Sequence, residues 1–553
     1  MKKLSLYSQL ITGLSSFIIV ITLSACGGSS SPETEEPPPP PPPSNSIESD
    51  KAARFLTQAT FGATSETIAT LANIGYDTWL QQQFNLPATL HYPLIQEYPE
   101  DDELNNRHRQ EVWWRTAITA EDQLRQRVAF ALSQIFVVSD KSSLGQTPYG
   151  LANYYDILVN NAFGNYRDLL EEVTLSPMMG IYLSMLGNEK PDTERNIRPD
   201  ENYAREVMQL FSIGLLKLNN DGSLILDDNN QPIPTYDQDV IKGFAHVFTG
   251  WHFADKPSWA QQGINLFDPM KSFEDFHDTG EKRLLDGETI PSGGTATSDL
   301  EAALDNIFNH PNVGPFISKQ LIQRLVTSNP SPDYINRVAT VFNDNGNGVR
   351  GDLKAVVEAI LVDDQAISDN TLQDSNFGKL KEPLIRFTQL WRAFDASAES
   401  GKYWFNFTYF ITGQAALSAP SVFNFYSPSF SPSGGVSDAG LVAPEFQILN
   451  ETYITHTINM LAYSTYVGYK GIALEQPDPD RILIDIDDEL NMASDPTQLV
   501  EHLDLLLMSG QMETNQKDDL IASINEISAD ETHLRVLNTL FMIVASPQFS
   551  IQK

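Results

Sequence analysis

The chain has 553 residues, of which 41% are hydrophobic, and it combines a formal net charge of −36 with a single cysteine. A surface this acidic repels the phosphate backbone, so the composition excludes nucleic acid as a partner. One cysteine leaves no disulfide within the chain, and stability must come from a buried core, for which the hydrophobic content is sufficient.

The first 25 residues have the pattern of a lipoprotein signal peptide. Lys2 and Lys3 precede an apolar stretch over residues 10–23, whose small polar interruptions suit a signal peptide better than a membrane span. The stretch ends in Leu-Ser-Ala-Cys, which predicts attachment of a lipid to Cys26. An ordinary signal sequence that happens to contain a cysteine is the alternative.

Residues 26–49 are expected to form a disordered, proline-rich spacer. Seven consecutive prolines at positions 37–43 favour an extended left-handed helix that rises about 3.1 Å per residue, so this run spans roughly 20 Å. A ligand for a proline-recognition domain is the sharper alternative. Because Gly27, rather than Asp, follows Cys26, we expect an exported protein anchored in the outer membrane, facing the periplasm or the surface.

Residues 50–553 are predicted to form one mainly α-helical domain with a small β-hairpin and long loops. Apolar residues recur at helical spacing over 52–59, 124–135, 499–507 and 534–544. Asp495 and Pro496 resemble a helix cap and first turn, and Gly75 resembles a helix stop. The hairpin is expected from residues 215–218 and 224–226, which flank an Asp-Gly turn.

Several segments resemble, in order, the bacterial family called domain of unknown function 1800. They include RFLTQATFG (54–62), NAFGNYRDLLEEVTLSPMM (161–179), ENYAREVMQLFSIG (201–214), YDQDVIKGFAHVFTGW (236–251), FHDTGEKRLL (276–285), HPNVGPFISKQLIQRLV (310–326) and APSVFNFYSP (419–428). The resemblance implies an exported, mainly helical bacterial protein whose genes often lie beside those of a sulfatase-like, uncharacterised family. It implies no reaction.

The densest polar helical segment runs over residues 200–206. Glu201 and Arg205 are four residues apart and are predicted to pair on one helical face. Glu201 and Glu206 are then candidate acid–base groups held by Arg205. An ion network that fixes the docking of the helix is the alternative.

A second group of candidates is rich in histidine. His277 and Asp278 are adjacent, and His246 and His252 flank a Thr-Gly-Trp turn. Together they are candidate ligands for a divalent metal, and His277 with Asp278 is also a candidate acid–base pair. Ordinary hydrogen-bonded histidines are the alternative reading, since the sequence has no HExxH motif.

The remaining chemical signals are aromatic. No GxSxG elbow, SxxK motif, P-loop or dinucleotide fingerprint is present. Trp404 and Tyr426 belong to aromatic-rich stretches and are candidate platforms for stacking against sugar rings, although aromatic residues at this density more often serve core or loop packing.

The sequence therefore favours a binding or assembly module of the cell envelope, with an envelope protein such as the sulfatase-like neighbour, or a polysaccharide, as its partner. The alternative is a metal-assisted hydrolase acting on an extracellular polymer. That alternative requires Glu201, Glu206, His277 and Asp278 to converge.

Overall fold

The structure is a computed structural model that describes residues 46–99, 103–473 and 476–553. The described residues belong to one compact unit, Pro43–Lys553. The predicted signal peptide, Cys26 and most of the proline-rich spacer lie outside them. Within the described ranges no helix is both long and apolar enough to cross a membrane.

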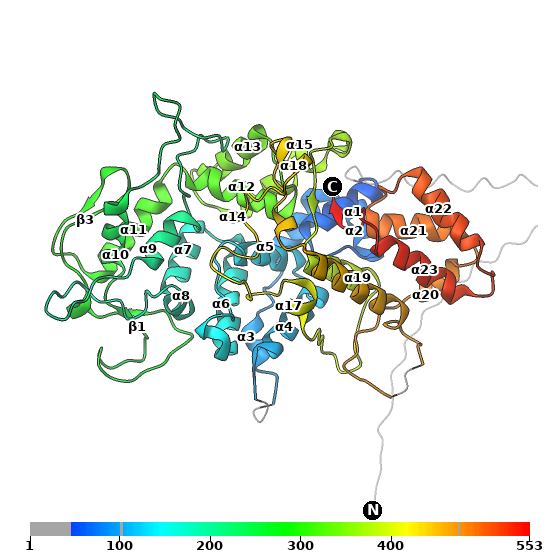
Figure 1. The fold of residues 1–553 in the computed structure, drawn as a ribbon, viewed down its shortest axis with the longest axis horizontal. Helices are drawn as coiled ribbons and strands as arrows, with labels where there is room; N and C mark the ends of the chain where they lie inside the picture. The colour runs from blue at the N-terminus through cyan, green and yellow to red at the C-terminus, as the bar shows by residue number, and fades with distance from the viewer. Residues whose placement is uncertain (1–45, 100–102, 474–475) are drawn as a thin grey trace, which may run out of the picture. The chain divides into compact units, whose positions relative to one another are not determined.

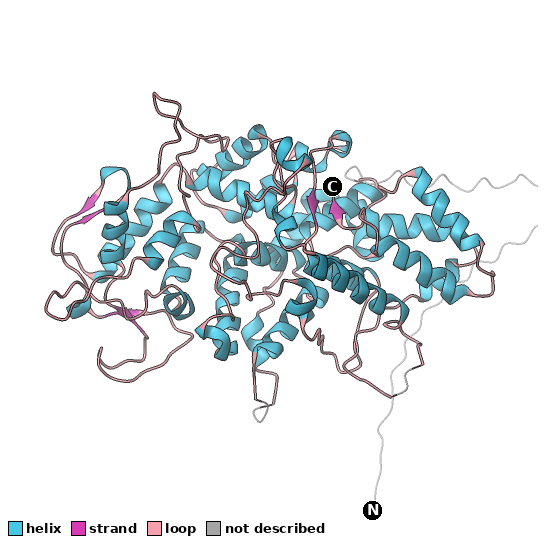
Figure 2. Cartoon of the chain, viewed as in Figure 1, coloured by secondary structure: helices cyan, strands magenta, loops and turns pink. Residues whose placement is uncertain are grey.

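The body is mainly helical, as predicted, and its first helices form the centre of the molecule (Figures 1 and 2). They are α1 (Ser49–Ala59), α2 (Ser65–Asn85), α3 (His91–Ile95), α4 (Asn106–Thr119), α5 (Gln123–Ser133) and α6 (Pro148–Asn160). Thr64 caps α2 by accepting from the Thr67 amide. Gly75 (φ 76°) interrupts α2 as predicted, because its left-handed backbone leaves the helical region.

The next helices run from the left-hand end of Figure 1, where α7–α11 lie, to the top of the view, where α13 and α15 lie. They are α7 (Tyr166–Leu175), α8 (Pro177–Tyr182), α9 (Asn202–Gln209), α10 (Gln238–Val247), α11 (Ala296–Asn309), α12 (Val313–Leu325), α13 (Pro332–Asn343), α14 (Leu353–Leu361) and α15 (Asp364–Ile367). Of these, α12 packs on α13 and also reaches α5, so it joins this group to the central helices.

The C-terminal helices include the antiparallel group α20–α23 at the other end of Figure 1. They are α16 (Pro383–Ala393), α17 (Thr408–Thr412), α18 (Gly435–Asp438), α19 (Glu451–Tyr466), α20 (Asp487–Met492), α21 (Pro496–Met508), α22 (Thr514–Asn525) and α23 (Thr532–Val544). Asp495 caps α21 and Pro496 occupies its first turn, as predicted.

The first helix of the body and the turn after it are covered by residues from the last third of the chain. Helix α1 packs against α21. Arg392 donates from Nε to the Gly62 carbonyl, 2.8 Å away, across 330 positions of sequence. A Cβ on Gly62 would lie 2.6 Å from the backbone of Gln389, so this contact requires glycine.

Strands in the described residues are short and occur in three antiparallel pairs (Figure 2). They are β1 (Trp251–His252) with β2 (Lys271–Ser272), β3 (Lys282–Arg283) with β4 (Thr289–Ile290), and β5 (Lys379–Leu380) with β6 (Ile551–Gln552). The predicted hairpin is present only as isolated bridges, such as Leu218 with Leu224. Leu216 and Leu226 also bridge to Pro234 and Pro232, so a third segment pairs with both arms of the hairpin.

Candidate functional site

The histidine-rich candidates gather around the C-terminal end of α10. Two glycines allow this close packing: a Cβ on Gly243 would lie 1.9 Å from the Arg283 carbonyl oxygen, and one on Gly250 would lie 2.9 Å from the His277 amide nitrogen. Helix α10 therefore packs directly on β3, and the turn after it lies on the segment that carries His277 and Asp278.

His246 and Asp278 form a half-buried dyad. His246 Nδ1 is bonded to Asp278 Oδ2, and the Asp278 amide donates to Thr249 Oγ1 over 2.9 Å. The bond from His246, with a second from the Gly280 amide, lowers the pKa of Asp278 to about 2. No described residue hydrogen-bonds His246 Nε2. An imidazole fixed through Nδ1 by a carboxylate is the arrangement of a general base.

His277 lies beneath this dyad and is fully buried. Its Nδ1 is 3.0 Å from the Thr249 carbonyl oxygen, and its Nε2 is 3.1 Å from Asp299 Oδ2. The same carboxylate oxygen accepts from Lys282 Nζ at 2.7 Å, and both of these side chains are buried. Since both ring nitrogens of His277 are engaged inside the protein, neither is available to a ligand.

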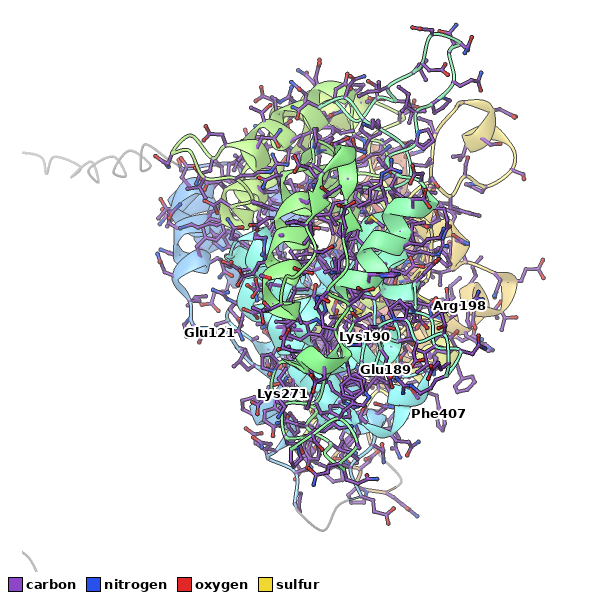
Figure 3. All side chains as sticks on the ribbon, turned by 90° about the vertical axis from the view of Figure 1, so that its left-hand side faces the viewer. Glu121, Glu189, Lys190, Arg198, Lys271 and Phe407 are labelled. Atoms are coloured by element: carbon purple, nitrogen blue, oxygen red, sulfur yellow. The ribbon has the colours of Figure 1, made fainter. Side chains whose placement is uncertain are left out.

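His252 is in a separate environment on β1. Its Nδ1 accepts from the Phe253 amide, and its Nε2 lies 2.9 Å from Lys256 Nζ. Burial and this lysine lower the pKa of His252 to about 4. The ring stacks edge-on with Trp259, whose indole donates to Glu189. Figure 3 views this end of the body and labels Glu189.

The predicted pair on α9 is present. Arg205 donates to Glu201 over 2.5 Å, and Gln238 of α10 also donates to Glu201. Glu206 points elsewhere: burial raises its pKa, and its Oε2 has no hydrogen-bond partner in the described part of the chain. Glu201 therefore makes the contacts expected of an ion network that docks α9 against α10, which is the alternative to a catalytic role.

The four residues of the single-site hydrolase are not joined by any described contact. Glu201 contacts Arg205 and Gln238, while His277 contacts Thr249 and Asp299. Across residues 46–99, 103–473 and 476–553, no three His, Cys, Asp or Glu side chains group closely enough to hold a metal ion. Of the metal candidates, His246 and Asp278 are the two that the structure brings together.

Trp404 lines a polar cavity of about 580 Å³. Its ring packs against those of His108 and Tyr98, and the Arg107 guanidinium lies 5.6 Å from its centroid. The cavity wall also carries Asp478, Asp480 and Arg481. A tryptophan beside charged and hydrogen-bonding groups is compatible with a sugar ligand.

Tyr426 is buried, and its hydroxyl donates to Gln134 over 2.7 Å, so its ring is not a free stacking platform. It does line a largely apolar pocket of about 470 Å³ between the end of α9, α12 and the loop 422–429. Three large side chains on the rim remain exposed although they are apolar: Leu215 (53%), Leu224 (44%) and Phe423 (56%).

The polar residues of this pocket are incompletely bonded. Four buried lining side chains keep one atom each without a partner among the described residues: Gln320 Nε2, Gln323 Oε1, Arg324 Nε and Asn424 Nδ2. The Gln323 amide donates to Ser328 and Pro428, so its oxygen is the free acceptor. Lys319, also in the lining, forms no ion pair with a described residue, and partial burial lowers its pKa. Buried polar atoms of this kind are unfavourable unless something binds them.

Behind the pocket lies a buried ionic network. Arg127 donates to the Arg324 carbonyl, and Arg324 donates to the carbonyls of Gln320 and Gln134. Neither guanidinium has a carboxylate within 4.0 Å among the described residues. Desolvation lowers the pKa of both arginines. The pocket floor is therefore rich in donors, and the buried carboxylates of Glu382 and Glu445 lie near its two arginines.

A family model described as protein of unknown function (DUF1800) matches residues 54–551. The chain belongs to the DUF1800 family. No curated protein and no solved structure matches it. Because the family description assigns no activity, the function of this DUF1800 body must be argued from its geometry.

Three of the segments through which the sequence resembles DUF1800 meet at the apolar pocket. They contribute Leu210, α12 and the Phe423–Tyr426 stretch. Sequence reasoning missed this site, since its residues are spread over more than 200 positions. A usable signal was present: Gln320, Gln323 and Arg324 interrupt the apolar pattern of α12, yet all three are buried.

Proposed function

We propose that this DUF1800 protein is a binding module of the bacterial cell envelope, exported and anchored by a lipid on Cys26. Its pocket accepts an amphipathic ligand that has an apolar body and an acceptor-rich or anionic head. The observation that carries the proposal is the combination of an exposed apolar rim with buried polar atoms that lack partners. Such a concave, apolar site with a few convergent polar groups is the usual form of a small-molecule site.

The anchoring is supported by the sequence pattern around Cys26 and by the following proline run. Labelling cells with radioactive palmitate tests it: the wild-type chain should incorporate label and Cys26→Ser should not. Fractionation of the membranes tests the outer-membrane location. Label on Cys26→Ser, or none on the wild type, would contradict the anchor.

The pocket is tested with 1-anilinonaphthalene-8-sulfonate, a fluorescent probe with an apolar body and an anionic head. The compact unit of residues 43–553 serves as the protein. Phe423→Ala should weaken binding about tenfold, because it removes part of the apolar wall, worth roughly 1.5 kcal/mol. Phe407→Ala is the matched control, since Phe407 is 74% exposed and lies outside the pocket lining (labelled in Figure 3). Equal effects of the two substitutions would refute the pocket assignment.

A polysaccharide partner is a second candidate, favoured by the aromatic and charged cavity around Trp404. This is tested by titrating the wild-type and Trp404→Ala proteins with envelope polysaccharide and following their tryptophan fluorescence. The fluorescence of the wild type should change, and that of Trp404→Ala should not. A change that persists in Trp404→Ala would place the contact elsewhere.

An envelope protein such as the sulfatase-like neighbour remains the proposed assembly partner, and copurification from envelope membranes tests that interaction.

The hydrolase alternative now depends on the His246–Asp278 dyad alone, because the buried contacts of His277 occupy both its nitrogens. Metal analysis of the purified body distinguishes the two functions. A stoichiometric divalent ion that is lost in Asp278→Asn would favour the hydrolase over the binding module.

A further inference from the structure

A second cavity, of about 640 Å³, lies where α1, the end of α21 and the C-terminal residues meet. It is polar, and it is separate from the pocket of the proposed function, with which it shares no lining residue. Its wall includes Lys381, which directly follows β5 and whose amide donates to the Ser550 carbonyl. The strand pairing of β5 with β6 therefore holds this lysine at the cavity.

The Lys381 amine has an unusual set of neighbours. The side chain is buried, and Nζ donates to Gln389 Oε1 over 2.7 Å. The Gln389 amide nitrogen donates to the Leu507 carbonyl, so its oxygen must face the lysine. Nζ also lies 4.7 Å from the centroid of the Phe549 ring. No described carboxylate lies within 4.0 Å of this amine.

A neighbouring cation further opposes charge on Lys381. Arg386 donates from Nε to the Lys381 carbonyl, is buried itself, and also has no carboxylate partner among the described residues. Burial, and then Arg386, lower the pKa of Lys381 to about 7. An uncharged lysine amine is a nucleophile.

Lys379 provides an internal contrast two residues earlier. It is equally buried, at 4% exposure, but its Nζ lies 2.9 Å from Glu445 Oε1 and donates to the Arg324 carbonyl. Lys379 therefore has a carboxylate beside its amine. The two lysines differ in the partner of the amine, which is the Gln389 side-chain amide for Lys381 and the Glu445 carboxylate for Lys379.

We propose that Lys381 is an amine site at which small aldehydes or ketones entering this cavity are captured as an imine. The nitrogen lone pair attacks the carbonyl carbon while the C=O π bond breaks, and an N–H proton passes to the oxygen. The carbinolamine then loses its hydroxyl group together with the remaining N–H proton as water, which leaves a neutral imine. A proton taken up from solvent water gives the iminium, whose N–H can donate to Gln389 Oε1. No oxidant or reductant is required.

The other charged groups of the cavity are compatible with an uncharged amine. The lining includes Asp50, Lys51, Arg54, Asp369, Glu513 and Lys553. Asp369 is engaged by Lys51 at 3.2 Å and by Arg54 at 3.4 Å. None of the three lining carboxylates lies within salt-bridge distance of Lys381.

Reductive trapping tests the proposal on the full-length protein. Propionaldehyde and sodium cyanoborohydride are added, and the alkylation rate of each lysine is followed by peptide mass mapping. At pH 7, Lys381 should react at least roughly tenfold faster than Lys379 and than exposed Lys242, because an ordinary lysine has a pKa near 10.4. Its rate should rise with an inflection near pH 7. A rate no greater than that of Lys242, or an inflection near pH 10, would overturn the proposal.

Gln389→Glu supplies the missing carboxylate with almost no change in shape. It should make Lys381 resemble Lys379, raising the inflection by at least one pH unit and reducing labelling at pH 7 about tenfold. Unchanged labelling in a folded Gln389→Glu protein would also overturn the proposal. The pH profile of Lys381 alkylation in the wild-type protein requires no variant, so it tests the proposal even if Gln389→Glu fails to fold.

Discussion

Two buried polar regions of the body differ in how completely their atoms are bonded. Beneath α10, Asp299 accepts from both His277 and Lys282, so each side chain of that cluster has a partner. At the floor of the apolar pocket, Gln320, Gln323, Arg324 and Asn424 each retain an atom without one among the described residues. The first arrangement stabilises the fold, and the second is suited to a ligand. Completeness of bonding, rather than the density of polar residues, therefore distinguishes a structural network from a binding site.

The strongest test of this comparison removes the shared carboxylate of the α10 cluster. Asp299→Ala should lower the free energy of unfolding by about 3–5 kcal/mol, because it leaves Lys282 and His277 buried without their partner. Urea unfolding followed by circular dichroism measures the change. Asp239→Ala is the control, since Asp239 is 68% exposed in its pair with Lys242. A loss below about 1 kcal/mol would remove the structural role assigned to Asp299.

The half-buried dyad above that cluster should make stability depend on pH. The pKa of Asp278 is about 2 in the folded protein and 3.8 ordinarily, so the folded state favours the charged form. Its contribution is present above about pH 4 and is lost as pH falls toward 2. After allowance for solvent exposure, we expect about 1 kcal/mol. Unfolding measured from pH 5 to pH 2 should show a shallower dependence in Asp278→Asn, and identical profiles would contradict the assignment.

Removal of a polar side chain from the pocket floor should change the stability of the fold much less than removal of Asp299. The Gln320 side chain makes no hydrogen bond with a described residue, so Gln320→Leu should change the free energy of unfolding by less than about 1 kcal/mol. Thermal unfolding checks this, and binding of the anilinonaphthalene probe should still weaken. A large destabilisation would show that Gln320 has a structural partner after all.

The smallest effect is expected on α9. Glu201 and Arg205 pair at the surface, with side chains that are 30% and 41% exposed. Glu201→Gln should cost less than about 0.5 kcal/mol, because solvent screens such pairs. Thermal unfolding at low and high salt measures the difference. A loss above 1 kcal/mol would place Glu201 in a tighter network than its contacts indicate.

Local features of the fold were predictable from the sequence, since they depend on neighbouring residues. The cap at Asp495, the break at Gly75 and the pairing of Glu201 with Arg205 are all present. The hairpin was less accurate, because the sequence pattern did not reveal that residues 231–235 would pair with both of its arms.

The sites were not predictable in the same way, because burial and partners come from distant segments. Lys381 and Glu382 are adjacent in the sequence, yet Glu382 accepts from Gln134 and Gln414, and Lys381 contacts Gln389. His277 has the sequence context of an exposed ligand and is buried. Only the tertiary packing determines which polar group keeps a free atom.

The sealing of α1 by the last third of the chain has a consequence for how this protein is made. The Gly62 carbonyl accepts a hydrogen bond from Arg392, and Thr57 Oγ1 lies 3.4 Å from Ser509 Oγ. The first helix therefore emerges from the ribosome long before these partners are synthesised. Contacts this distant in sequence form slowly and leave apolar surface uncovered in the meantime. The face of α1 that packs on α21 must therefore stay uncovered until almost the full length of the chain has been synthesised.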